Sequence, residues 1–312
     1  MILTITMNPS IDISYPLDKL VIDRVNRVSN ISKTAGGKGL NVTRVLHQLN
    51  EPVKASGLLG GNFGQYIRKR LDEESMKHDF SEISSETRNS IAILHEGNQT
   101  EILENGPEIN EKELNTFFET YKRLLQEVDI VTISGSLPKG VKRDYYSILI
   151  EEANRQKVKT LLDTSGETLT KSIQDNSKPD LIKPNEEEIS QVLGQKVETI
   201  VELQKALKND LFDGIEWIVV SLGENGALVK HKNNIYKVDV PNIEAVNPVG
   251  SGDSILAGLA YGISNGKTPE ETMKIGMVTG MLNAMNQKTG HIDIRYFDEL
   301  FTQILVDKID NE

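Results

Sequence analysis

The chain has 312 residues, a formal net charge of −11 and no cysteine. This acidity argues against nucleic acid, which needs a basic face, and the missing cysteines exclude disulfides, cysteine-ligated zinc and a thiol nucleophile. No apolar run approaches the ~20 residues of a membrane span, and the first residues lack the features of a signal peptide. We therefore expect a soluble cytoplasmic protein with no nucleic-acid or membrane partner.

The N-terminal third combines core elements with short segments of a smaller sheet. Residues 2–6 predict a strand that ends at Asn8-Pro9, because proline cannot continue a β-ladder. A strand that closes at Leu58-Leu59 and helices over 39–49 and 65–75 follow the same core pattern. The remaining segments are short, partly alternating and rich in β-forming residues, and they predict a small β lid: 10–15, 20–31, 88–95 and 100–104.

From residue 110 onward, strands and helices alternate. The predicted strands are 128–133, 158–163, 180–183 and 215–221, with a hairpin over 226–238. The predicted helices are 111–126, 143–155, 186–193, 199–209, 253–264, 269–286 and 295–305. Aliphatic strands that alternate with amphipathic helices indicate parallel pairing and right-handed crossovers. The predicted fold is therefore α/β: a doubly wound, mostly parallel sheet flanked by helices, formed by residues 1–312 as one domain, with the lid within about 10–34 and 87–105.

Residues 246–263 contain the strongest motif. Pro248 ends the segment before it, and Gly250 and Gly252 supply a permissive backbone ahead of an apolar helix. Such a turn directs unpaired N–H groups and the positive end of a helix dipole at one point, which suits a phosphate. Asp253 falls in the first helical turn, where it either caps the helix or faces the bound anion. Taken alone, the stretch is explained equally well as a capped helix after a loop.

A second glycine-rich turn, Gly36-Gly37-Lys38-Gly39, opens the helix over 39–49. It is a candidate site for an anion or a polyol, with Lys38 as a mobile charge. The dinucleotide-binding pattern fails here, because no third glycine follows Gly37-x-Gly39 at the required spacing and no strand leads cleanly into the turn. No Gly-Lys-Ser/Thr occurs either, so any nucleotide must be held by other means.

Polar segments also follow three predicted core strands, and ligands of such sheets bind beyond the carboxyl ends of the strands. These segments are Ser134-Gly135-Ser136, Lys183-Pro184-Asn185 and Ser221-Leu222-Gly223. Each could be ordinary turn chemistry, but their coincidence with the two glycine-rich turns favours a site. In the lid, Asp12 and Arg88 are either site residues or a turn residue and a solvated charge. The five histidines show no metal-ligand spacing, so no zinc site is predicted.

Two of these motifs together resemble the signatures of the ribokinase-like (PfkB) carbohydrate kinases. The first runs from Gly36 to Val42 and the second from Asn247 to Asp253, and Asn185-x-x-Glu188 and Ser221-Leu222-Gly223 follow the family's order. The resemblance therefore covers the whole chain. It implies an ATP-dependent kinase that phosphorylates the C1 hydroxyl of D-tagatose 6-phosphate, with fructose 1-phosphate and fructose 6-phosphate left open as alternatives.

The resemblance also implies a role for each motif residue. Asp253 would be the general base, beside an anion hole formed by Gly250, Ser251 and Gly252. Sugar hydroxyls would contact Asp12, Gly36, Gly37 and Asn41, and the phosphate on the sugar would contact Lys38, Arg88, Arg27 and Ser136. ATP would contact Lys183, Asn185, Ser221, Gly223, Gly226 and Asn283. Glu188 would order Mg²⁺, largely through water.

Assembly and ions follow from the same resemblance. A small lid has edges and faces that need cover, and in this family two lids clasp each other, so we predict a homodimer. Members that bind a monovalent cation often carry Asp where this chain has Asn247, which leaves open whether potassium binds.

Two other classes remain to be weighed. A dinucleotide-dependent oxidoreductase would need a G-x-G-x-x-G after the first strand, which residues 7–12 lack. A non-catalytic sugar-phosphate sensor would be expected to have lost Asp253 or the Gly-Ser-Gly turn, and both are present.

Overall fold

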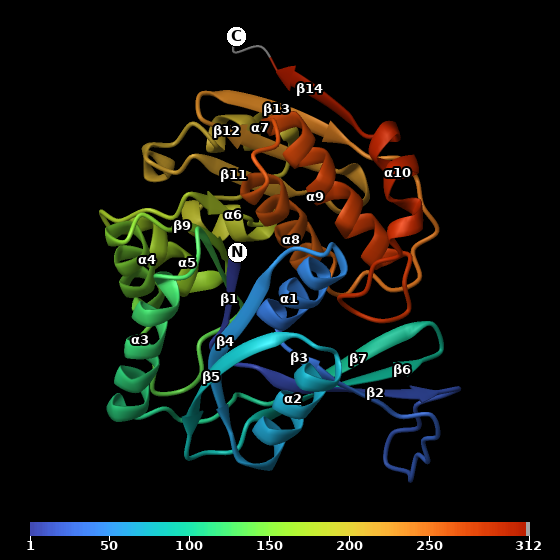
Figure 1. Cartoon of the computed structure of the whole chain (residues 1–312). Coiled ribbons are helices and arrows are strands. Elements are labelled where there is room, and N and C mark those ends of the chain that lie inside the picture. The colour runs from blue at the N-terminus through green and yellow to red at the C-terminus, as the bar shows by residue number, and fades with distance from the viewer. Residues whose placement is uncertain (310–312) are drawn as a thin grey trace.

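A computed structural model describes residues 1–309, which form two β-sheets with helices packed around the larger one (Figure 1). The larger sheet has ten strands: β1 (Ile2–Thr6), β4 (Val53–Gly60), β5 (Lys77–Ile83), β8 (Ile130–Ser134), β9 (Lys159–Asp163), β10 (Leu181–Ile182), β11 (Trp217–Ser221), β12 (Ala227–His231), β13 (Asn234–Asp239) and β14 (Leu305–Ile309). They lie in the order β14-β13-β12-β11-β10-β9-β8-β1-β4-β5.

Strand β1 lies inside the parallel part of the sheet, between β8 and β4. Ile2 lies opposite both Val53 of β4 and Ile130 of β8, so the chain order reverses on either side of β1. Strands β11 to β5 in the sheet order are parallel, whereas β12, β13 and β14 extend the edge antiparallel. All residues of β1 are buried, as expected for a parallel strand covered on both faces. A switch of strand order of this kind is where doubly wound sheets bind ligands.

Helices cover both faces of the large sheet (Figure 1). They are α1 (Lys38–Gln48), α2 (Gly61–Glu73), α3 (Glu111–Leu125), α4 (Tyr145–Arg155), α5 (Gly166–Gln174), α6 (Glu186–Leu193), α7 (Ile200–Ala206), α8 (Ser251–Ser264), α9 (Pro269–Ala284) and α10 (Phe297–Gln303). Phe117 and Tyr121 of α3 belong to one hydrophobic core, and Leu256 of α8 and Met277 of α9 belong to another. No helix within residues 1–309 combines the length and apolar character needed to cross a membrane.

The smaller sheet is the lid, with strands β2 (Ser10–Leu17), β3 (Ser32–Gly36), β6 (Arg88–His95) and β7 (Asn98–Leu103) in the order β3-β2-β6-β7. Figure 1 shows it beside α2, away from most of the large sheet. Ile11 and Ile13 of the lid share a hydrophobic cluster with Ile67 of α2 and Phe80 of β5. One face of the lid is therefore anchored, whereas every residue of β7 is exposed.

These observations confirm the predicted α/β class, the parallel sheet and the small lid. The predicted strand over 20–31 is wrong, because the third lid strand is β3. The intervening residues form a loop in which Ile22 is 80% exposed and Val25 79% exposed. The Asn26 side chain bonds to the N–H and the carbonyl of Val21, so a local turn replaces a β-ladder there.

The C-terminal prediction needs a second correction. The helix expected over 295–305 ends at Gln303, and Leu305 begins β14, which pairs antiparallel with β13. Strand β5 and helix α5 were not predicted. The single domain over 1–312 includes residues 310–312, which lie outside the described residues, and its extent stays a prediction.

Candidate active site

The turn before α8 is shaped by glycine. Gly250 is the N-cap with φ of 82°, a conformation that favours glycine, and a Cβ there would lie 2.5 Å from Cγ2 of Thr289. The N–H of Ser251 donates to the carbonyl of Pro248, over 3.2 Å. The N–H groups of Gly252 and Asp253 have no intrahelical acceptor in the first turn and remain at the helix end. The anion hole formed by Gly250, Ser251 and Gly252 stays a prediction, and the Ser251 N–H already has one acceptor within the turn.

Asp253 lies in this first turn and is 5% exposed. Its Oδ2 accepts a hydrogen bond of 2.8 Å from Nδ2 of Asn41, which lies on α1. Burial raises the pKa of Asp253 to about 6, although the nearby Lys38 ammonium opposes this rise. The carboxylate is thus held by a donor from a second helix and has more proton affinity than an exposed aspartate.

Two lysines share one buried aspartate next to this turn. Lys38 Nζ lies 3.3 Å from Oδ1 of Asp163, and Lys183 Nζ lies 3.3 Å from Oδ2. Burial alone would raise the pKa of Asp163, but the two ammonium groups hold it below its usual range. A Cβ at Gly252 would lie 3.1 Å from Lys183 Nζ, so this ammonium stands directly against the turn. The cluster brings positive charge to the end of α8, where a phosphoryl group would be transferred.

Lys38 was predicted to bind the phosphate on the sugar together with Arg88, but the two side chains have different surroundings. Asp163 raises the pKa of Lys38, and Asp253 and Glu188 act in the same direction. The Lys38 side chain is still 45% exposed, so its ammonium can also meet a bound ligand. The charges that act on Lys38 are therefore those of Asp163, Asp253 and Glu188, and its contact with the phosphate on the sugar stays a prediction.

The lid contributes Asp12 and Arg88. Ser10 Oγ donates to Asp12 Oδ1 over 2.6 Å, and a Cβ at Gly36 would overlap the Asp12 carboxylate, so glycine makes room for it. Burial raises the pKa of Asp12, whereas Arg88 opposes this rise. The Arg88 guanidinium donates to the backbone carbonyl of Asn8 through Nε and Nη2, each over 3.3 Å. Asp12 and Arg88 thus lie on neighbouring lid strands near the carboxyl end of β1.

The other residues predicted at the sugar site include Gly37, Ser136 and Arg27. Gly37 is the N-cap of α1 with φ of 107°, and a Cβ there would lie 3.0 Å from Cγ2 of Thr6. Ser136 Oγ accepts a hydrogen bond of 3.3 Å from Nδ2 of Asn8. Arg27 lies on the exposed loop between β2 and β3, and within residues 1–309 no hydrogen bond or ion pair joins it to the other predicted residues.

The predicted nucleotide side lies beyond β10 and β11. Asn185 caps α6: its Oδ1 accepts from the N–H of Glu188, and a carboxylate oxygen of Glu188 accepts from the N–H of Asn185. Asn185 also forms a β-bridge with Ser221, which brings the ends of the two strands together. Gly223 has φ of 59° and Gly226 has φ of 79°, so glycines again shape the turn.

Asn283 lies on α9 behind the turn that precedes α8. It is fully buried, and its Nδ2 donates to the carbonyl of Val249 over 2.9 Å and to Ser251 Oγ over 3.2 Å. Its Oδ1 accepts from the N–H of Gly290 over 2.7 Å. These contacts occupy the amide, so Asn283 supports the turn before α8. Its predicted place near the adenine stays a prediction.

Sequence reasoning missed Asp163, Asn8 and Arg44. Asp163 is the last residue of β9 and Asn8 follows β1, both at the same sheet edge as the predicted residues, so the rule on strand ends could have found both. Arg44 is a 3% exposed arginine in the middle of α1, and its position gave no local signal.

The chain matches the family model described as pfkB family carbohydrate kinase over residues 5–294. The chain belongs to this family. A curated relative named tagatose-6-phosphate kinase, from Staphylococcus epidermidis, is 54% identical over 307 residues, which cover 98% of this chain and 99% of the relative. This pfkB protein is therefore a kinase, and its family uses ATP and a divalent metal.

Solved structures of this family have the same fold. Escherichia coli phosphofructokinase-2 in complex with potassium is 27% identical with a TM-score of 0.89, over 96% of this chain and 98% of that chain. A possible 1-phosphofructokinase of Thermotoga maritima is 25% identical with a TM-score of 0.90, over 99% of this chain and 100% of that chain.

Proposed function

We propose that this pfkB kinase transfers the γ-phosphoryl group of ATP to the C1 hydroxyl of D-tagatose 6-phosphate, which yields D-tagatose 1,6-bisphosphate. The curated relative supports this choice of acceptor, since it carries that name at 54% identity over nearly the whole chain. The observation that carries the chemistry is the buried Asp253 at the start of α8, next to a glycine turn and two lysines.

Asp253 acts as the general base in this proposal. Its pKa of about 6 leaves it ionised at neutral pH, yet with more proton affinity than an ordinary aspartate. A carboxylate of this strength does not remove the proton of an alcohol beforehand. The proton therefore leaves the acceptor hydroxyl as the new bond to phosphorus forms.

The surrounding cations and N–H groups stabilise the transferring phosphoryl group. Phosphoryl transfer depends more on positioning and charge neutralisation than on a strong base. Lys38 and Lys183 supply positive charge, and Asp163 holds both ammonium groups in place. The N–H groups at the start of α8 add the positive end of the helix dipole.

The residues present fit a magnesium ion held mainly through water. Within residues 1–309, no three acidic or imidazole side chains gather as a set of metal ligands. Mg²⁺ usually keeps several waters and binds one or two carboxylates plus the phosphates of the nucleotide. Glu188 would contribute such a carboxylate, although one of its oxygens also caps α6. When bound, the ion would neutralise charge on the phosphates of ATP.

The lid completes the sugar site in this proposal. Asp12 and Asn41 accept or donate hydrogen bonds to sugar hydroxyls, and Arg88 binds the phosphate already on the sugar. We propose that two lids cover each other in a homodimer; E. coli phosphofructokinase-2, a structural neighbour, has a form described as tetrameric. The cytoplasmic location stays a prediction.

A panel of acceptors tests the proposal. ADP release is measured in a coupled assay with tagatose 6-phosphate, fructose 1-phosphate, fructose 6-phosphate and the free sugars. The highest kcat/KM is expected for tagatose 6-phosphate, with a product that carries a new phosphate at C1 by ³¹P NMR. The fructose phosphates are the second candidates, because the structural neighbours include proteins named phosphofructokinase. A clear preference for either of them would overturn the assignment of the acceptor, and no ADP release with any would overturn the proposed function.

A further inference from the structure

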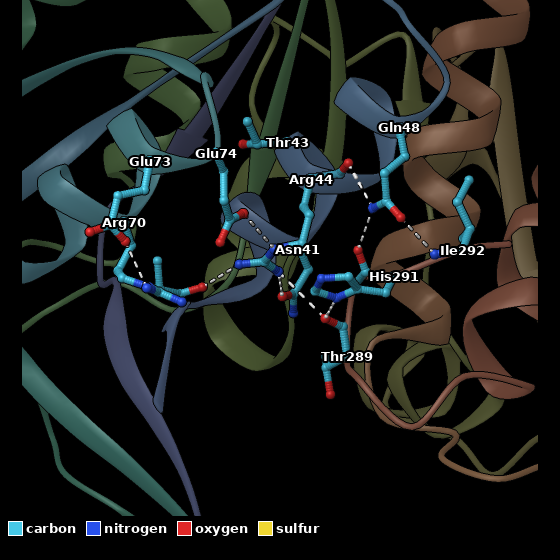
Figure 2. A network of polar contacts seen from close by, with 12 residues as sticks. Asn41, Thr43, Arg44, Gln48, Arg70, Glu73, Glu74, Thr289, His291 and Ile292 are labelled. Atoms are coloured by element: carbon cyan, nitrogen blue, oxygen red, sulfur yellow. Dashed lines mark hydrogen bonds and ion pairs between the residues drawn. The ribbon is translucent and has the colours of Figure 1, made fainter. Parts of the chain in front are cut away.

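Arg44 is a buried cation on α1 that the proposed function does not use. It is 3% exposed and lies one helical turn from Asn41 (Figure 2). Arg44 Nη1 donates to Asn41 Oδ1 over 3.0 Å, and Asn41 Nδ2 donates to Asp253 Oδ2 over 2.8 Å. A continuous chain of hydrogen bonds therefore runs from Arg44 to the proposed base.

The orientation of the Asn41 amide depends on both of its partners. An asparagine amide has one accepting end and one donating end, and a rotation of 180° exchanges them. An ionised Asp253 can only accept, so it needs the NH₂ group. Arg44 can only donate, so it needs the oxygen. The flipped amide would place N–H groups against the guanidinium and an oxygen against the carboxylate, which are two repulsive contacts.

The Arg44 guanidinium is itself fixed by several elements. Nη2 donates to the carbonyl of Ala35 on β3 over 2.6 Å, and Nη1 also donates to the carbonyl of Thr289 over 3.5 Å. Glu74, which follows α2, lies 3.7 Å from Nε. A Cβ at Gly290 would lie 2.8 Å from Nη1, so the loop after α9 closes tightly over the group. Figure 2 shows Arg44 at the centre of this network, which prevents it from following a flip of the amide.

We propose that Arg44 is a positioning residue for phosphoryl transfer, which fixes the Asn41 amide so that its nitrogen donates to Asp253. The inference rests on the proposed function, since it takes Asp253 as the base. Arg44 touches the base only through Asn41. Without the guanidinium, only the contact with Asp253 favours this orientation, so the amide flips more often and the ionised carboxylate loses its donor for part of the time. Its proton affinity then rises, and the carboxylate is held less well toward the acceptor hydroxyl.

Several other charged groups lie near Asp253 or Arg44, and their effects on the acid limb must be distinguished from the effect of Arg44. Lys38, Asp163 and Lys183 also affect the pKa of Asp253, but none of them contacts Arg44 through a hydrogen bond or ion pair within residues 1–309. His291 lies on the loop against Arg44, and burial lowers its pKa below the usual range (Figure 2). A His291→Asn variant therefore accompanies the test, and an unchanged acid limb in it excludes His291 as the source of that limb. Arg44 also opposes the rise that burial causes in the pKa of Asp12, so an acid limb that moves in the Arg44 variants but not in Asn41→Ala would belong to Asp12 and would overturn the proposal.

The experiment compares kcat and the pH dependence of kcat/KM for the native enzyme, Arg44→Met and Arg44→Lys. Gln48→Met is the matched control, because Gln48 also ties α1 to the loop after α9 through Gly290 and Ile292 but does not contact Asn41. We expect Arg44→Met to lower kcat about 10- to 100-fold and to move the acid limb about one unit to higher pH. Arg44→Lys keeps the charge and one donor, so a smaller shift is expected. Gln48→Met should lower the melting temperature without moving the acid limb.

The decisive comparison repeats Arg44→Met in an Asn41→Ala background. If Arg44 acts through Asn41, the second change should lower kcat by less than about threefold there. An unmoved acid limb in both Arg44 variants, or an equal loss of kcat in the two backgrounds, would overturn the proposal. If Arg44→Met does not fold, Arg44→Lys carries the same comparison. The assay uses whichever ketose phosphate the native enzyme phosphorylates fastest, so a different acceptor from the proposed one does not affect this test. A native enzyme that phosphorylates none of them would refute the proposed function instead.

Discussion

Lys38 Nζ and Asp163 Oδ1 lie 3.3 Å apart, although 125 residues separate them in the chain. This ion pair joins the glycine-rich turn before α1 to the carboxyl end of β9. Asp163 is buried, and its second oxygen lies 3.3 Å from the ammonium of Lys183. A buried carboxylate with two cationic partners leaves one excess positive charge beside the start of α8, where phosphoryl transfer is proposed.

The first prediction concerns the base. Asp253→Asn keeps the shape of the side chain but cannot accept the proton, so kcat should fall by roughly 10²–10⁴ while ATP affinity changes little. In the native enzyme, kcat/KM should fall as the pH drops through about 6, because Asp253 is then protonated. Steady-state kinetics between pH 5 and 8 measure both effects. Near-normal turnover of the variant would show that another group takes the proton.

The second prediction concerns stability. The pKa of Asp253 is raised from 3.8 to about 6 in the folded protein, so ionisation costs folding free energy above pH 6 and nothing below pH ~4. Two pKa units correspond to about 3 kcal/mol, and Asp253→Asn should recover part of it at pH 7 to 8. Thermal melting across pH should show a stabilised variant whose advantage disappears toward pH 4.

Asp163→Asn is the matched control for this measurement. Its two lysine partners depress the pKa of Asp163, so the charged form stabilises the folded state at neutral pH and loses that effect as the pH falls through the folded pKa. The control should therefore melt earlier than the native protein at pH 7. A destabilised Asp253→Asn at the same pH would contradict the inferred cost of burying that carboxylate.

Local patterns in the sequence were enough to predict the glycine turns and the alternating strands and helices. The turn before α8 depends on residues next to each other, so Gly250 and Asp253 could be found without a structure. The Lys38–Asp163 pair and the position of Asn283 could not, because both depend on contacts between distant segments. The loop around Val25 was predicted as a strand from its β-forming residues. Its side chains are exposed, and β propensity alone does not make a strand where no core covers the side chains.

The third prediction concerns the exposed apolar face of the lid. Leu94 of β6 and Leu103 of β7 are 39% and 58% exposed and lie on the same face of the lid, because Leu103 pairs with Ser90 and side chains alternate along a strand. A second lid would bury these side chains, so sedimentation should give the mass of a dimer. The double change Leu94→Lys and Leu103→Lys should give the mass of a monomer. Ile148→Lys, at an exposed apolar position of α4 outside the lid, is the control and should remain a dimer. A native mass of a monomer at all concentrations would refute the assembly.

The fourth prediction concerns monovalent cations. Asn247 Nδ2 donates to the carbonyl of Gln287 over 3.1 Å, and its Oδ1 accepts from the N–H of Val249 over 3.0 Å. The Asn247 amide is therefore hydrogen-bonded to the Gln287 carbonyl and the Val249 N–H, and it carries no charge that would attract a cation. Replacing potassium with tetramethylammonium should change kcat less than about twofold. Asn247→Asp should introduce a dependence on potassium, and a native enzyme that stops without potassium would contradict this account.

The last prediction concerns how the acceptor is recognised. The Arg88 guanidinium donates to the carbonyls of Asn8 and Glu104, and within residues 1–309 no carboxylate lies within the 4 Å of an ion pair with it. Burial lowers the pKa of Arg88, but arginine stays charged at neutral pH. Its charge is therefore available for an anion, and a sugar phosphate carries about two negative charges that a guanidinium can bind bidentately.

Arg88→Ala should accordingly lower kcat/KM for the sugar phosphate by ~10² or more, since each charged hydrogen bond lost at a buried site is worth roughly 1.5–3 kcal/mol. The already poor rate with free tagatose or fructose should hardly change. Arg68→Ala removes another arginine near the lid that already pairs with Glu82, and it should leave both rates close to native. Initial rates with phosphorylated and free sugars, measured at several concentrations, separate these cases. Equal losses on both kinds of acceptor would show that Arg88 supports the lid through Asn8 and Glu104 and does not read the phosphate.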